Sequence, residues 1–187
     1  MSQEEFTPPG SCGSCVVCCE ALNINTPQIT KKSGVLCQHC TGGGCGIYQT
    51  RPQVCRGFYC GWRMIKGFGE DWRPDRSGIL ILVVPDHPAQ YTGAATGFNF
   101  VILGGEAAIM RPGVSEYIAQ LVSHDVAVFL SADSLKTLIN DFLKDLVAAG
   151  NMPGVTKMLL HIYNLHLEAK RTGLLDADGN MTENALR

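Results

Sequence analysis

The first third of the chain carries an unusual density of cysteine thiols. All nine cysteines of the 187-residue sequence lie between Cys12 and Cys60. The stretch SCGSCVVCCEAL, residues 11–22, holds four of them with C-x2-C-x2-C-C spacing. The candidate ligands are Cys12, Cys15, Cys18, Cys19, Cys37, Cys40, Cys45, Cys55 and Cys60. Thiols gathered in this way serve as a disulfide framework, as a dithiol redox site or as a metal site.

A disulfide framework fits these thiols poorly. Nine is an odd number, so one thiol would be left over. The opening MSQEEFTPPG has no basic and no apolar region of a secretory signal, so we expect a cytoplasmic protein whose thiols stay reduced. The chain is also long enough to bury an ordinary core without disulfide cross-links.

Metal binding accounts for the spacing best. A C-x2-C turn lets two sulfurs converge on one ion, and structural zinc takes four such ligands. The run resembles the start of a ferredoxin motif, but the later x3-C-P is absent because Cys19 follows Cys18 at once. Thiolates suit zinc, copper(I) and iron–sulfur clusters alike. We therefore expect zinc or iron, with an iron–sulfur cluster included, as the cofactor.

The number of thiols bears on the number of ions. Nine exceed the four that one tetrahedral ion needs. Eight would suffice for two separate four-thiolate sites, and fewer would suffice for a multinuclear site with bridging thiolates. The neighbours Cys18 and Cys19 diverge in a helix or a strand, so they serve two metals or comprise one ligand and one bystander. A redox pair in CGSC or CVVC is the minority interpretation, because no thioredoxin-like βαβ pattern surrounds it. His39 is expected on the loop surface.

CGSCVVCC, followed by CGIYQTRPQVCR at residues 45–56, resembles the CxxCxxCC family of zinc- or iron-chelating cysteine-cluster proteins of the YkgJ type. The resemblance covers roughly residues 12–60. It implies that seven cysteines are ligands: Cys12, Cys15, Cys18, Cys19, Cys37, Cys45 and Cys55. Cys40 and Cys60 lie outside the general pattern. A flagellin lysine N-methylase carries a similar pattern, which implies an enzymatic alternative.

Residues between the last cysteines have expected supporting roles. Ile47 and Tyr48 are expected to pack in the core beside the cluster. Arg51 and Arg56 are expected to lie beside the thiolates, where their cationic side chains offset negative charge or donate hydrogen bonds. Arg63 is a further candidate cation. Pro52 is expected to begin a helix that carries Cys55.

The second half predicts the elements of an α+β fold. The continuous aliphatic run ILILVV predicts a strand at 79–84, and the segments FNFVIL and VAVFL indicate further strands at 98–103 and 126–130. Helices are predicted at 113–124, 133–149 and 154–171. The second helix is predicted from apolar residues at i, i+3, i+4 and i+7. Its expected N-cap is Ser131 or Asp133, and Gly150 is expected to end it. Residues 85–97 and 104–113 are predicted loops.

These patterns predict a cysteine-rich metal-binding region over residues 1–76, packed on a core of mixed strands and helices over residues 77–187. The two regions are separate, or they form one compact domain. A net charge of −2 without a basic stretch argues against nucleic acid. The longest apolar run, residues 78–85, is too short to span a membrane. We expect a cytosolic metal-binding protein whose partner is a metal ion. A protein partner, a cluster-containing lysine N-methylase-like enzyme and a thiol redox sensor stay open as alternatives.

Overall fold

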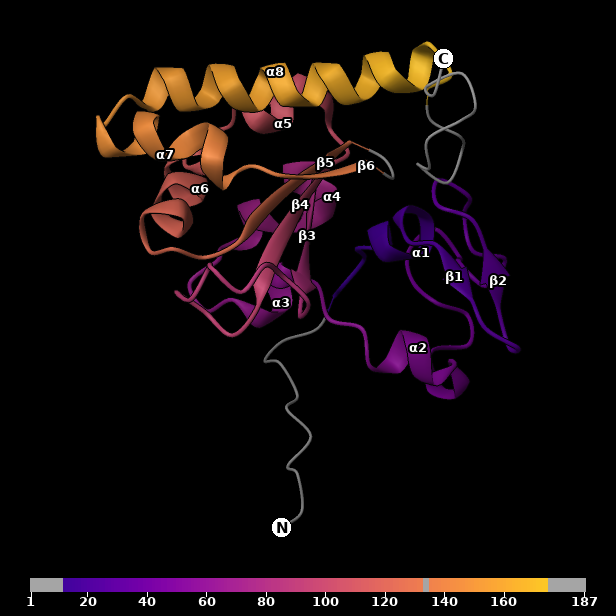
Figure 1. The fold of residues 1–187 in the computed structure, drawn as a ribbon. Coiled ribbons are helices and arrows are strands. Elements are labelled where there is room, and N and C mark those ends of the chain that lie inside the picture. Colours follow the sequence, from indigo (N-terminus) through magenta and orange to yellow (C-terminus); the bar gives the residue numbers. More distant parts are fainter. Residues whose placement is uncertain (1–11, 133–134, 175–187) are drawn as a thin grey trace. The chain divides into compact units, whose positions relative to one another are not determined.

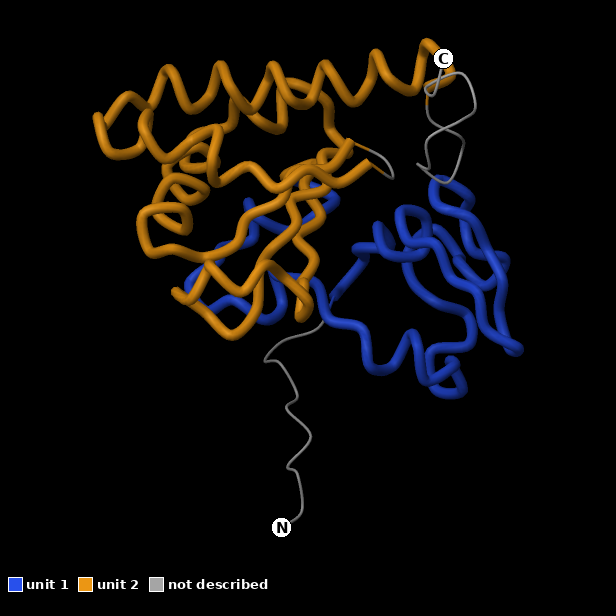
Figure 2. Tube along the Cα trace, in the orientation of Figure 1, with its two compact units in different colours: residues 1–76 blue, residues 77–187 orange. Residues whose placement is uncertain are grey.

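The computed structural model describes residues 12–132 and 135–174. The chain forms two compact units, Met1–Arg76 and Ser77–Arg187, which are called the first and the second unit below (Figure 2). Every cysteine belongs to the first unit, and the four-stranded sheet belongs to the second. The fold class is α+β, as predicted.

The first unit consists of short elements joined by turns. In chain order they are α1 (Val17–Ala21), β1 (Ile24–Asn25), β2 (Thr30–Lys31), the 3-10 helix η1 (Tyr48–Thr50), α2 (Gln53–Arg56), α3 (Gly61–Met64), the 3-10 helix η2 (Glu70–Trp72) and α4 (Pro74–Ser77). Strands β1 and β2 form an antiparallel pair. None of these helices is long enough to be stable by its own hydrogen bonds, so side-chain interactions must hold them.

The first unit has a thin apolar core. Among its described residues, 12–76, the buried apolar side chains are Ile24, Ile29, Cys60 and Pro74. A unit of this size needs more buried apolar surface than four side chains supply, unless covalent or metal cross-links hold it. Its stability must therefore depend on something other than apolar packing.

The second unit is built on a sheet of β3 (Ile79–Val84), β4 (Gly97–Ile102), β5 (Val128–Ala132) and β6 (Leu135–Leu138), in that spatial order. The β3–β4 and β5–β6 pairs are antiparallel, and the β4–β5 pair is parallel. Phe100 lies opposite Ile81 on one side and Leu130 on the other, and all three side chains are buried. The predicted strands at 79–84 and 98–103 are confirmed.

Four helices accompany the sheet: α5 (Gly105–Ile109), α6 (Val114–Ser123), α7 (Asn140–Ala148) and α8 (Met152–Arg171). They gather on one side of it, with α8 the longest (Figure 1). Asn151 caps α8 by accepting a hydrogen bond from the Gly154 amide at 3.0 Å. Ile118, Leu143 and Leu159 from three of these helices are fully buried. No helix in the described part of the chain combines the length and apolar character needed to cross a bilayer.

The predicted helix over 133–149 is wrong in its first part. Residues 135–138 form β6, and the helix begins only at Asn140. The Asn140 side chain explains the boundary: it accepts from the Val128 amide at 2.8 Å and donates to the Val126 carbonyl at 2.8 Å. These bonds hold the chain beside β5, where 135–138 completes the sheet. Ser131 lies in β5 and caps no helix, and Asp133 lies outside the described residues.

Two smaller differences concern segment boundaries. The strand predicted at 126–130 lies at 128–132, and α5 occupies part of the predicted loop 104–113. Gly78 and Gly104 meet where β3 begins and β4 has ended. A Cβ atom on Gly78 would lie 2.7 Å from the Gly104 Cα, so both positions require glycine.

Candidate metal centre

The nine thiols come from elements spread along the first unit. Cys18 and Cys19 lie on α1, Cys55 lies on α2, and Cys60 is the N-cap of α3. Cys37, Cys40 and Cys45 lie in the loop after β2, and Cys12 and Cys15 precede α1. All nine are free; Cys60 is buried and the other eight are half-buried. Pro52 directly precedes the helix that carries Cys55, as predicted.

Four thiols form one interacting set, Cys12, Cys15, Cys18 and Cys60, called group A. The pKa of Cys18 is raised to about 11, mainly by burial and then by the thiols of Cys12, Cys15 and Cys60. Burial also raises the pKa of Cys60, and Cys12 and Cys15 add to that effect. Cys60 therefore lies within electrostatic reach of Cys12 and Cys15, although it is far from both in sequence.

Hydrogen bonds join the segments that carry group A. The Cys15 amide donates to the Cys12 carbonyl at 3.1 Å, which closes the C-x2-C turn. The Arg63 amide donates to the Cys60 carbonyl at 2.9 Å, and the Arg63 Nη1 donates to the Cys12 sulfur at 3.3 Å. Arg63 therefore links the N-terminal turn with α3, and it places a positive charge beside the thiols.

Backbone amides also point at two sulfurs of group A. The pKa of Cys15 is raised by burial and lowered by the amides of Val17 and Asp75. The amides of Arg63 and Trp62 likewise lower the pKa of Cys60 against the larger effect of burial. Amides directed at sulfur stabilise the thiolate, which is the form that binds metal.

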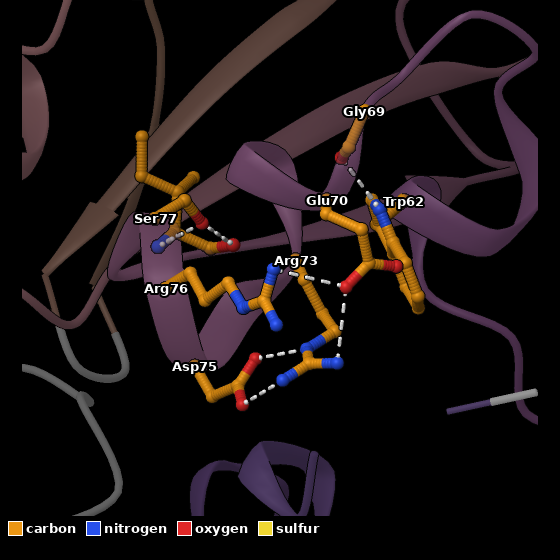
Figure 3. A network of polar contacts seen from close by, with 8 residues as sticks. Trp62, Gly69, Glu70, Arg73, Asp75, Arg76 and Ser77 are labelled. Atoms are coloured by element: carbon orange, nitrogen blue, oxygen red, sulfur yellow. Dashed lines mark hydrogen bonds and ion pairs between the residues drawn. The ribbon is translucent and has the colours of Figure 1, made fainter. Parts of the chain in front are cut away.

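A network of polar contacts fixes the segment that supplies the Asp75 amide (Figure 3). Arg73 binds Asp75 through two hydrogen bonds, of 2.7 and 2.9 Å, and Glu70 through one of 3.1 Å. The hydrogen bonds of Arg73 hold the pKa of Asp75 below its ordinary value. Arg73 also lies against the Cys12–Cys15 turn, since a Cβ atom on Gly13 would be 3.5 Å from its Nη1.

The other five thiols, Cys19, Cys37, Cys40, Cys45 and Cys55, form a second set called group B. The pKa of Cys19 is raised to about 12, mainly by burial and then by the thiols of Cys18, Cys40 and Cys37. The pKa of Cys55 is raised by burial and then by Cys37 and Cys45, while Arg51 and Lys31 lower it. Group B therefore draws on α1, the loop after β2, and α2.

The backbone brings the members of group B together. The Cys37 amide donates to the Cys19 carbonyl at 2.9 Å, and the Cys40 amide donates to the Cys37 carbonyl at 2.9 Å. Cys40 and Cys45 form an antiparallel bridge across the glycine-rich turn between them. Gly42 in that turn has a φ of 82°, a conformation that favours glycine. The sequence TGGG therefore brings two cysteines side by side.

Lys31 is a buried cation in the neighbourhood of group B. Its side chain donates to the carbonyls of Glu20, Leu22 and Lys32, so all three ammonium protons have acceptors. Burial lowers the pKa of Lys31, while Cys37 and Cys19 act in the opposite direction. The sequence does not predict this role, because nothing in its spacing separates Lys31 from its exposed neighbour Lys32.

The residues predicted to support the thiol site, Tyr48, Arg51 and Arg56, lie in different surroundings. The Arg51 guanidinium lies 3.9 Å from the centre of the Tyr48 ring, and its charge lowers the pKa of Cys55. Tyr48 is 51% exposed, so the expectation that it packs in the core is wrong; one ring face is covered by Arg51 instead. Arg56 ends α2 with an exposed side chain. His39 is half-buried and its ring contacts Gln38 at 3.3 Å.

The thiols lie in one part of the chain, but their sulfurs are not arranged around a common point where an ion would bind. Within residues 12–132 and 135–174, no three His, Cys, Asp or Glu side chains are arranged as a ready-made site for a metal ion. Comparison with known proteins assigns no family: no protein-family model matches the chain, and neither a curated protein nor a solved structure matches it significantly. The resemblance to the CxxCxxCC family therefore stays a prediction from the motif.

Proposed function

We propose that the first unit binds metal ions, zinc or iron, through the thiolates of groups A and B. The observation that carries the proposal is that the first unit has nine free thiols but few buried apolar side chains. Residues 12–76 bury four apolar side chains and carry nine free thiols. Metal–thiolate bonds supply the cross-links that such a unit otherwise lacks.

The surroundings of the thiols support a thiolate site. Arg63 donates directly to the Cys12 sulfur, and Arg51 and Lys31 favour the ionised form of Cys55. Several backbone amides act on Cys15 and Cys60 in the same direction. Cations and amides of this kind offset the negative charge of metal-bound thiolates and orient the ligands.

The open arrangement of the sulfurs is consistent with coupled binding and folding. Metal ligands of small domains seldom form a finished site before the ion arrives, and the binding free energy then appears as folding free energy. The short helices α1, α2 and α3 each carry a cysteine or have one as their N-cap, so an ion bound by these thiols would cross-link the three elements. Binding replaces thiol protons with the ion and orders the loops.

The two alternatives have weaker support. A redox sensor uses an exposed cysteine with a lowered pKa, whereas burial raises the pKa of Cys15, Cys18, Cys19, Cys55 and Cys60. A lysine N-methylase-like enzyme would need a substrate site beside the thiols, and no contact among the described residues favours that function over metal binding.

The test is a titration of the reduced full-length chain with cobalt(II), whose thiolate complexes are coloured. We expect intense sulfur-to-cobalt charge-transfer absorption that saturates at a whole number of ions per chain. A variant with all nine cysteines replaced by serine is the control, and it should show no such absorption. A wild-type chain that folds and gives only the spectrum of hydrated cobalt would refute the proposal.

A further inference from the structure

We infer that Cys40 and Cys45 form a modification site, in which the two thiols close reversibly into a disulfide when a low-molecular-weight disulfide acts as the oxidant. The inference goes beyond the proposed function and does not depend on it, since the reaction needs two thiols and no ion. It rests on the way the backbone pairs the two residues across the glycine-rich turn between them.

The backbone places Cys40 and Cys45 directly opposite each other in an antiparallel bridge. A hydrogen bond lies on either side of this pair. On one side the Gly46 amide donates to the His39 carbonyl at 2.8 Å, and on the other the amide after Cys40 donates to the carbonyl before Cys45 at 3.0 Å. The two cysteines are therefore a non-hydrogen-bonded pair, the kind in which facing side chains approach most closely.

The spacing of such a pair matches the geometry of a disulfide. Facing residues of this kind have Cα atoms about 4.5 Å apart, and disulfides join Cα atoms that are roughly 4.4–6.8 Å apart. The Cβ atoms of facing residues also lie on the same face of the ladder. Formation of the bond therefore needs rotation of two side chains and no rearrangement of the backbone.

The turn between the two cysteines fixes their register. The Thr41 hydroxyl donates to the Gly44 carbonyl at 3.2 Å and so reinforces the backbone bond between the same two residues. Gly42 has a φ of 82°, whereas Gly43 does not adopt a positive φ. A Cβ atom at either glycine would have no described atom within 4 Å. A side chain at Gly42 would therefore strain the backbone, and one at Gly43 would not.

Other cysteines close in sequence are not paired in this way. Cys55 and Cys60 have the same C-x4-C spacing, but Cys55 lies within α2 and Cys60 is the N-cap of α3. Cys37 and Cys40 are joined by one hydrogen bond across a C-x2-C turn, from the Cys40 amide to the Cys37 carbonyl at 2.9 Å. The bridge holds the backbone on both sides of its pair. We therefore expect Cys45, and not Cys37, to be the partner of Cys40.

The reaction is thiol–disulfide exchange in two steps. Both thiols are half-buried, so a small oxidant can reach them. The thiolate of one cysteine attacks a sulfur of the oxidant, whose S–S bond breaks; a mixed disulfide forms and one small thiolate leaves. The thiolate of the other cysteine attacks the protein sulfur of the mixed disulfide, and the second small thiolate leaves. Two electrons pass from the cysteines to the oxidant, and the released thiolates take up the two cysteine protons.

The disulfide withdraws two of the nine thiols from other chemistry. Metals bind the thiolate form of cysteine, so this bond and an ion held through Cys40 or Cys45 exclude each other. The oxidation state of the pair therefore decides whether all the thiols of group B are free to act as ligands.

The test treats the reduced full-length chain with oxidised glutathione and follows which disulfides form. The chain is measured as purified and again after a chelator has removed any bound metal. Thiols that are still free are blocked with N-ethylmaleimide at successive times, and linked peptides are identified by mass spectrometry. The pair Cys55 and Cys60 is the internal control, and the same chain in concentrated urea is the control for the fold.

We expect the Cys40–Cys45 disulfide to form at least about tenfold faster than Cys55–Cys60 in one or both native samples. In urea the two rates should be similar, because both pairs close loops with four residues between the cysteines. Faster formation of Cys37–Cys40, similar rates of the two C-x4-C pairs in both native samples, or glutathione that stays attached to Cys40 would overturn the inference. The proposed function is tested separately by cobalt binding and stands or falls without this result.

Two matched variants test the register without removing a thiol. G42V places a β-branched side chain at a positive φ and should slow the Cys40–Cys45 disulfide about fivefold or more. G43V carries the same side chain one residue later and should react at the wild-type rate. If both variants are slowed equally, or if neither is slowed, the backbone register does not drive the reaction and the inference fails.

Discussion

The Nη1 atom of Arg63 donates a hydrogen bond of 3.3 Å to the sulfur of Cys12, although the two residues are 51 positions apart. Arg63 lies on α3, a helix that begins directly after Cys60. Cys12 is the first cysteine of the C-x2-C turn. The contact therefore joins the two ends of the cysteine-rich segment and places a permanent positive charge beside group A. It explains how Cys60, outside the general spacing of the motif, comes to share a set with Cys12.

Replacing Arg63 with methionine should weaken metal binding at group A. Loss of the hydrogen bond and of the charge should lower zinc affinity about 10- to 100-fold, as for other groups that orient metal ligands. Competition with a coloured chelator measures this affinity. The control K66M removes an exposed cation three residues later and should change the affinity little. Equal affinities for R63M and the wild type would show that the contact has no role in binding.

Replacing Lys31 with methionine should destabilise the first unit. Three carbonyl acceptors, of Glu20, Leu22 and Lys32, would lose their donor, at a cost of about 1–3 kcal/mol in the free energy of unfolding. Both tryptophans of the chain, Trp62 and Trp72, lie in this unit, so their fluorescence during urea unfolding reports on it.

The matched control for Lys31 is its exposed neighbour. K32M leaves the Lys32 carbonyl in place and should unfold at nearly the same urea concentration as the wild type. If K31M and K32M unfold alike, the buried ammonium contributes nothing to the first unit and its placement beside group B is incidental.

The second unit should lose stability in mild acid because of His166. Its Nδ1 accepts from the Ala132 amide at 3.2 Å, so the proton is on Nε2, which bonds Thr137 at 2.8 Å. Burial lowers the pKa of His166 from the ordinary 6.5. Below about pH 6.5 the unfolded chain takes up a proton before the folded chain does, so stability falls until the folded-state pKa is reached.

Urea unfolding followed by circular dichroism at about pH 7.5 and pH 5.5 measures this effect. The wild type should lose stability at the lower pH, and H166Q should lose less, since glutamine does not titrate. H161Q removes an exposed histidine of the same helix and should behave as the wild type. An identical pH dependence for the wild type and H166Q would exclude His166 as the cause.

The centre of the sheet should be far more sensitive to truncation than the helix surface. Phe100 on β4 is 0% exposed, so Phe100→Ala should cost about 3–5 kcal/mol. Phe142 on α7 is 52% exposed, and Phe142→Ala should change stability by about 0.5 kcal/mol or less. Circular dichroism of both variants in urea gives the comparison. Similar losses at the two sites would contradict the assignment of the core.

The sequence predicts those parts of the second unit whose local pattern has one interpretation. The continuous aliphatic run of β3, the mostly apolar segment of β4 and the amphipathic pattern of α8 are of this kind. The segment around Leu135 and Leu138 is different, because its i, i+3 apolar spacing predicts a helix although the segment forms an edge strand. What decides it is the bonding of Asn140 to the backbone of Val126 and Val128. Such a tertiary contact leaves no periodic signal.

The thiols of the candidate site were evident from spacing, but their grouping was not. Cys55 and Cys60 are close in sequence and belong to different groups, whereas Cys60 joins Cys12 from the far end of the segment. Arg63 was predicted only as one of several cations, and Lys31 was not predicted. Both act through contacts between distant segments, which composition and spacing do not encode.

Metal analysis of the native chain tests the central claim most directly. The full-length protein is purified without oxygen or chelators, and its zinc, iron and acid-labile sulfide are measured per chain. The account predicts a whole number of thiophilic metal ions per chain. It also predicts that a chelator which removes them alters the fluorescence of Trp62 and Trp72 while the circular dichroism of the second unit persists. A chain that is folded, free of metal and able to react at all nine thiols, even after incubation with zinc and iron(II), would contradict it.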